Sequence, residues 1–327
     1  MSHIQIKSSL ALDTLCFLEK RLLNDTKWMN EKQIEEIKYI NALLPGDFGD
    51  NYIGMSNICL IVSAYFDGDL ECLTLDDLID MFNDPRKIEN TVKERITGGF
   101  TASYIYPVLE WLNDGYASLY AKRLTVLKKI GFESIYKERI LPMVYSEMKQ
   151  KEAEVAGYDA DSLFRNVSLL KKSSVIASAN IYVSFFSAPT AFTLYGGSFL
   201  TCFCPAGSVD FYSMIAHELM HGFASEKLTE LYRKHVESNE KLKACHHALL
   251  EDYPGDEEEF VMAAEYYLCY LSGNYSKEQL LKRARKEYGG NYPTSIAIFK
   301  QLLHEPRVPE DYNEWLIGQF ESNQISI

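Results

Sequence analysis

The chain has 327 residues, of which 47% are hydrophobic and 24% charged, the balance of an ordinary globular protein with room for more than one domain. Its net charge of −13 argues against a nucleic-acid partner, which would need a basic face. The cysteine count of 7 is odd and includes no C-x-x-C pair, which indicates reduced, buried thiols rather than a disulfide framework.

Neither the N-terminal segment nor the apolar stretches predict export or membrane insertion. Asp13, Glu19 and Lys20 interrupt the region in which a signal peptide would be continuously apolar. The longest apolar stretch elsewhere, around residues 58–66, is too short to span a bilayer. We therefore expect a cytoplasmic protein without a membrane partner.

Helical patterns dominate the first half of the chain. Residues 10–24 carry apolar side chains close to the helical period, and Thr74 can cap a helix whose apolar residues share one face. Gly98-Gly99 interrupts the chain before another helix, and a charged helix is predicted over roughly residues 137–155. These patterns predict a helical N-terminal region over residues 1–165.

After residue 173 the sequence becomes rich in β-branched and aromatic residues, in the segments SSVIASANIYVSFFS, AFTLYGG and SFLTCFCP. These segments predict three short strands, the last two joined by a tight turn at Gly196-Gly197. Helical patterns return from about residue 225, including an apolar helix FVMAAEYYLCYLSG after an acidic loop. We expect an α+β fold, mostly α, with a second domain over residues 166–327.

The segment SMIAHELMHGF carries a metal-ligand pattern in His217, Glu218 and His221. A spacing of four residues puts both imidazoles on one helix face, about 6 Å apart at the Cβ atoms, where they can bind one zinc ion. Glu218 follows the first histidine, so its carboxylate can reach the remaining coordination position, where it can act as a general base on a water. The residues around the histidines are uncharged, which predicts a buried helix whose polar groups need partners such as a metal.

This motif, placed after a hairpin and before a glutamate-bearing helix, resembles the gluzincin branch of the zincin peptidases, which includes thermolysin and the catalytic domain of anthrax lethal factor. The resemblance covers roughly residues 173–272. It implies a zincin-like domain with a small sheet, an active-site helix and a third-ligand helix, and a zinc peptidase acting on peptide or protein substrates. The metzincin branch is excluded, because Ala224 and Lys227 stand where its pattern requires glycine and histidine.

In this branch the third zinc ligand is a glutamate on a helix that packs against the motif helix. The candidates in this chain are Glu257, Glu258, Glu259 and Glu265. We favour Glu259, because glutamate and phenylalanine followed by small residues resemble the ligand helix of the lethal-factor type. The chain lacks the acidic residue that usually follows four positions later, so Glu258 and Glu265 stay as alternatives.

The resemblance also implies a downstream tyrosine or histidine that stabilises the oxyanion. Tyr292, in a Gly-Gly-Asn-Tyr-Pro loop, is the first candidate, followed by Tyr288 and His304. A metal-dependent hydrolase of a non-peptide bond and a zincin-fold interaction protein with little activity are the alternatives to a peptidase. Glu218 favours an enzyme, because an interaction protein has no physical need for a general base.

Overall fold

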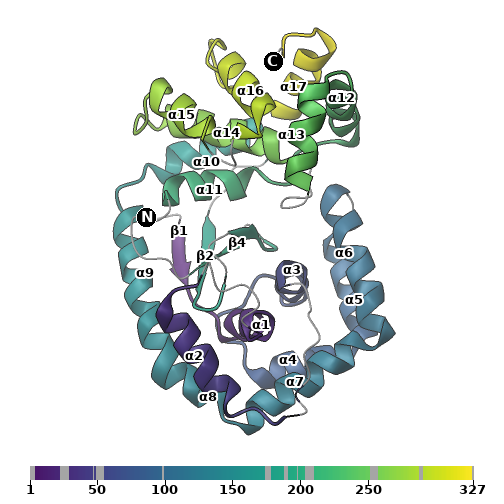
Figure 1. Ribbon diagram of the computed structural model, residues 1–327, viewed down its shortest axis with the longest axis vertical. Helices are drawn as coiled ribbons and strands as arrows, with labels where there is room; N and C mark the ends of the chain where they lie inside the picture. The colour runs from purple at the N-terminus through teal and green to yellow at the C-terminus, as the bar shows by residue number, and fades with distance from the viewer. Residues whose placement is uncertain are drawn as a thin grey trace. The chain divides into compact units, whose positions relative to one another are not determined.

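The computed structural model describes the chain over the following residues: 4–22, 29–46, 48, 55–97, 99–173, 178–187, 191–196, 198–202, 210–250, 257–286 and 290–325 (Figure 1). Within these ranges the chain is mostly helical and contains one small mixed sheet. This confirms the α+β, mostly α class predicted from the sequence. Among the described helices, none is both long and apolar enough to cross a membrane.

The chain divides into two compact units, each built from separate stretches of sequence. The N-terminal unit contains Ser2–Ala156 and Ser178–Val209, and the C-terminal unit contains Gly157–Ala177 and Asp210–Ile327. The strands therefore group with the early helices. The sequence pattern, which divided the chain at residue 165, assigned them to the later region instead.

Several helices of the N-terminal unit begin at residues whose side chains cap the first turn. Asn30 with Gln33 and Thr74 with Asp77 form capping boxes, and Asp84 caps a helix whose first residue is Pro85. The elements in chain order are β1 (Ile4–Lys7), α1 (Leu10–Lys20), α2 (Glu31–Asn41), α3 (Met55–Tyr65), α4 (Leu75–Phe82), α5 (Pro85–Arg95), α6 (Gly99–Trp111), η1 (Leu112–Tyr116), α7 (Ala117–Lys129), α8 (Phe132–Ile135), the π-helical η2 (Tyr136–Ile140), α9 (Leu141–Val155), β2 (Ala179–Ser184), β3 (Phe192–Thr193) and β4 (Ser198–Cys202). The chain is kinked within η1, where Gly115 has a φ of 112°.

The four described strands form one sheet in the order β1-β2-β4-β3. β1 and β4 both pair in parallel with β2, with Ile4 opposite Ala179 and Ser198 opposite Asn180, whereas β3 pairs antiparallel with β4. β2, β3 and β4 match the three predicted strands. In the predicted turn between β3 and β4, Gly196 has a positive φ of 76°, and Gly197 lies outside the described residues. β1 was not predicted from the sequence.

A buried carboxylate holds α1 against the end of β2. Asp13 accepts hydrogen bonds from the Ser184 hydroxyl at 2.6 Å, from the Phe185 N–H at 2.6 Å and from the Phe186 N–H at 3.3 Å. The Tyr136 hydroxyl donates to the other carboxylate oxygen at 3.0 Å. Burial raises the pKa of Asp13 to about 6, although the four donors oppose this shift, so the carboxylate is mostly ionised at neutral pH.

Replacing Asp13 by alanine is expected to lower the free energy of unfolding by about 3 kcal/mol, because four buried donors lose their acceptor at once. Urea-induced unfolding measures the change. Asp80→Ala, at an exposed position of α4 in the same unit, is the matched control and should change stability by less than about 0.5 kcal/mol. If Asp13→Ala lowered the free energy of unfolding as little as the control does, this account of the contact between α1 and β2 would be contradicted.

The C-terminal unit consists of helices only, within its described residues. They are α10 (Ala160–Leu170), α11 (Phe211–Met220), α12 (Glu226–Glu237), α13 (Glu240–Leu250), α14 (Glu258–Leu271), α15 (Lys277–Ala284), α16 (Pro293–Leu302) and α17 (Tyr312–Glu321) (Figure 1). α14 is buried from Glu259 to Cys269 and packs against α11 and α16. It is therefore the central helix of this unit, and it carries acidic side chains into the core beside α11.

Candidate metal site

The histidine motif lies on α11, a helix that ends at the motif itself. Asp210 caps its N-terminus, with its side chain accepting a hydrogen bond from the Ser213 N–H at 3.2 Å. The helix ends at Met220, so His221 occupies the C-cap with φ −55° and ψ 150°, and Gly222 follows with φ 80°. The chain therefore turns away directly after the second histidine.

Both histidines meet a glutamate from α14. The Nε2 atoms of His217 and His221 lie 3.2 Å apart, and the Glu258 carboxylate lies 3.4 Å from the first and 3.7 Å from the second. One ligand atom from each of the three residues lies within 4.8 Å of the others, so the group could hold a metal ion. Two imidazole nitrogens and a carboxylate oxygen are the donors of many catalytic zinc sites.

The three candidate ligand side chains are partly accessible, whereas the carboxylates of Glu257 and Glu265, which contact the histidines from behind, are buried. The side chains of His217, His221 and Glu258 are 19%, 24% and 25% exposed. Those of Glu257 and Glu265 are 7% and 5% exposed. A metal held by the first three residues would therefore keep a side on which water and a substrate can approach.

The charges of this group favour a cation. Burial would lower the pKa of His217, but its contacts with Glu258 and Glu265 raise that pKa well above the usual value. Burial likewise opposes ionisation of Glu258, yet the neighbouring histidines lower its pKa to about 2. The glutamates thus favour the protonated imidazoles, and a bound metal would compete with those protons.

The other ring nitrogen of His217 contacts Glu265, two helical turns beyond Glu258 on α14. The Nδ1 atom lies 3.0 Å from Glu265 Oε2. The second carboxylate oxygen accepts hydrogen bonds from the Ser213 hydroxyl and, at 2.8 Å, from the Arg283 guanidinium. A carboxylate at Nδ1 holds the hydrogen there and leaves Nε2 free for a metal.

Glu257 supports His221 in the same manner. Its Oε2 lies 3.4 Å from His221 Nδ1, and the carboxylate accepts hydrogen bonds from the backbone N–H groups of Gly222, Phe223 and Ala224 at 3.1, 3.0 and 3.0 Å. The Lys171 ammonium donates to the carbonyls of Leu219 and His221 at 3.0 and 2.6 Å. These contacts fix the backbone on both sides of the second histidine.

The structure does not bring Glu259, the favoured third ligand, to the histidines. Its carboxylate accepts hydrogen bonds from the Tyr232 hydroxyl at 2.6 Å and from the Ser295 N–H at 2.9 Å. Burial raises the pKa of Glu259 to about 7, although both donors oppose the shift. Neighbouring residues on a helix point about 100° apart, so Glu258 and Glu259 cannot both face α11. The alternative, Glu258, takes the place beside the histidines.

The other predicted residues lie as follows. Glu218 is buried on α11, and its charge contributes to the raised pKa of His221. Tyr292 is buried directly before α16, with its carbonyl accepting a hydrogen bond from the Ser295 hydroxyl at 2.8 Å. His304 follows the end of α16, and Tyr288 lies outside the described residues. The catalytic roles of Glu218 and Tyr292 stay predictions.

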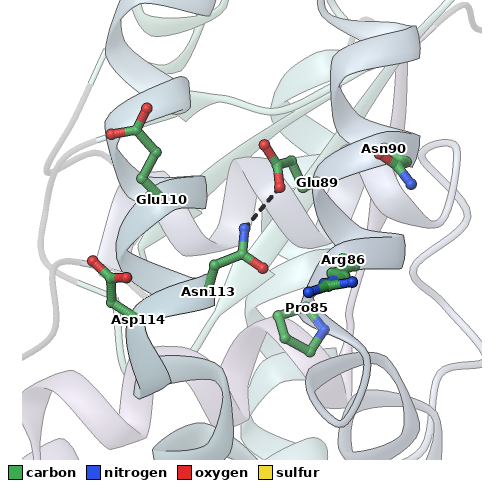
Figure 2. A pocket seen from close by; sticks show the side chains of 7 residues that line it. All are labelled: Pro85, Arg86, Glu89, Asn90, Glu110, Asn113 and Asp114. Atoms are coloured by element: carbon green, nitrogen blue, oxygen red, sulfur yellow. Dashed lines mark hydrogen bonds between the residues drawn. The ribbon is translucent and has the colours of Figure 1, made fainter.

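A groove in the N-terminal unit offers no comparable chemistry. It lies between α5 and the segment formed by α6 and η1 (Figure 2), and Asn113 crosses it to donate a hydrogen bond to Glu89 at 2.8 Å. Its lining residues are Pro85, Arg86, Glu89, Asn90, Glu110, Asn113 and Asp114. This lining contains neither histidine nor cysteine, and its charged side chains are of both signs.

Comparison of the chain with protein-family models, with curated proteins and with solved structures finds no match. Arguments about function therefore rest on the chemistry of the site. The residues that sequence reasoning did not connect with the histidines are Lys171 and Arg283, because each reaches α11 from a distant part of the sequence.

Proposed function

We propose that this protein is a zinc-dependent hydrolase of peptide bonds. His217, His221 and Glu258 are the proposed metal ligands, and Glu218 is the proposed general base. The observation that carries the proposal is the convergence of two imidazole Nε2 atoms and one carboxylate within 4.8 Å, on partly exposed side chains. Three protein ligands leave a coordination position open, which distinguishes catalytic from structural zinc sites.

The residues of the chain have distinct tasks in this proposal. When bound, zinc would act as a Lewis acid that acidifies a water and polarises a carbonyl. Glu218 accepts the proton of the attacking water at its carboxylate and delivers it to the leaving amine. Glu257 and Glu265 keep the Nδ1 hydrogens on the two imidazoles, so that Nε2 stays available to the metal. Tyr292 is the proposed additional donor to the oxyanion.

The purified protein is expected to contain about one zinc per chain, because the site offers two imidazoles and one carboxylate to a metal with a tetrahedral preference. Elemental analysis measures the zinc, and a mixed peptide library analysed by mass spectrometry reports cleavage. Prolonged dialysis against a chelator should remove both the zinc and the cleavage, and added zinc should restore them.

Three results would count against the proposal in different ways. A protein without zinc, even after incubation with it, would contradict the metal site. Zinc-loaded protein that leaves every peptide intact but hydrolyses ester or amide test compounds would favour a hydrolase of a non-peptide bond. Zinc-loaded protein inactive on all of them would favour an interaction protein.

A further inference from the structure

Arg283 lies directly behind Glu265, on the side away from the histidine. From α15 its guanidinium donates to Glu265 Oε1 at 2.8 Å, to the Ser213 hydroxyl at 2.6 Å and to Asp210 Oδ2 at 3.3 Å. The side chain thus connects the N-terminus of α11 with the middle of α14. Its contacts continue through Glu265 to Nδ1 of His217, so Arg283 reaches the proposed zinc ligand through one intermediate carboxylate.

The two oxygens of Glu265 have different partners. Oε1 accepts hydrogen bonds from Arg283 and Ser213, whereas Oε2 faces His217 at 3.0 Å. Because Oε1 is held on one side, the carboxylate plane is fixed, and Oε2 is aimed at the imidazole. A carboxylate held only by the hydroxyl and the imidazole could rotate, and the imidazole ring would rotate with it.

The charge of Arg283 is as important as its shape. The Glu265 side chain is only 5% exposed, and an isolated carboxylate at that depth would be strongly disfavoured. A guanidinium offers several N–H donors in a rigid plane, so a single side chain can hold Glu265, Ser213 and Asp210 together. The ammonium group of a lysine, with its single nitrogen, could not hold all three partners together.

We propose that Arg283 is a positioning residue of the metal site, which acts on His217 through Glu265. The role rests on the proposed function, because it presumes that His217 binds zinc. Arg283 does not contact the metal or the substrate in this role. Its removal is expected to weaken zinc binding by loosening the orientation of His217, although all three ligand residues are still present.

The test is a double-mutant cycle on zinc affinity, measured by competition with a chromophoric chelator in the whole chain of 327 residues. Arg283→Gln should raise the zinc dissociation constant about 10-fold, and Glu265→Gln about 10- to 100-fold, the range found for residues behind metal ligands. The double variant should bind zinc no more weakly than Glu265→Gln alone. Lys282→Gln, one residue earlier on α15 and exposed, removes the same charge and should leave the affinity unchanged.

Cobalt gives a second measurement that a purely structural role would not change. The visible absorption of the cobalt-loaded protein reports ligand geometry, and the spectrum of Arg283→Gln should differ from those of the wild type and of Lys282→Gln. If Arg283→Gln does not fold, as judged by circular dichroism without metal, Arg283→Lys takes its place in both measurements.

The outcomes separate the two proposals. Failure of the wild type to bind zinc would overturn the metal site and the role of Arg283 together. Normal zinc binding by the wild type with an unchanged affinity in Arg283→Gln would overturn the role of Arg283 alone. Fully additive losses in the double variant would also overturn it, because Arg283 would then act independently of Glu265.

Discussion

Replacing Glu218 by glutamine is expected to slow the hydrolysis of a cleaved peptide by at least about 10²-fold, the lower end of the contribution of a positioned general base. Glutamine has the size of glutamate and can still form hydrogen bonds, but its amide cannot accept the proton of the attacking water. The zinc content should stay near that of the wild type, because Glu218 is not one of the three converging ligands. Single-turnover rates and elemental analysis provide the two measurements.

Glu230→Gln, at an exposed position of α12, removes the same charge from the same unit and serves as the control. It should leave both the rate and the zinc content unchanged. Full activity in zinc-loaded Glu218→Gln would show that another residue activates the water. Loss of zinc and of folded structure in this variant would assign Glu218 a structural role instead.

Glu258→Gln is expected to remove nearly all zinc under conditions in which the wild type keeps about one per chain, since it converts an anionic ligand into a neutral amide. The expected loss exceeds the 10- to 100-fold range typical of residues that only support a ligand. Elemental analysis after gel filtration in a weak chelator makes the comparison.

Glu259→Gln is the matched control, one residue further along the same helix. With a pKa of about 7, Glu259 is partly protonated at neutral pH, and glutamine imitates its protonated form. This variant should therefore keep its zinc and fold normally. If Glu259→Gln loses the metal while Glu258→Gln keeps it, the register of α14 described here is wrong.

The histidines of the candidate metal site could be recognised from the sequence because their pattern is local. His217, Glu218 and His221 lie within one helical turn and a half, so their mutual placement follows from the helix alone. Which glutamate joins the histidines depends on how α14 is rotated about its axis against α11, and a run of three glutamates at its start leaves that rotation open. The interval of seven residues between Glu258 and Glu265 indicates that both lie on one face of the helix, because seven residues make about two helical turns.

The elements that the sequence did not reveal depend on contacts between distant residues. β1 is only four residues long, and its partner β2 is separated from it by about half the sequence. No local sequence pattern therefore predicts β1. The association of the strands with the N-terminal helices likewise depends on long-range contacts such as those of Asp13 with Ser184. Lys171 and Arg283 are ordinary basic residues in the sequence and acquire their roles only through folding.

The ends of α11 and α14 also give the site a directional electric field. α11 ends just before His221, so its last carbonyl groups, which carry the negative end of the helix dipole, lie beside the imidazoles. α14 begins at Glu258, so the positive end of its dipole lies beside the carboxylates of Glu257 and Glu258. The peptide backbone therefore favours positive charge at the histidines and ionised carboxylates opposite them, independently of the contacts between these side chains.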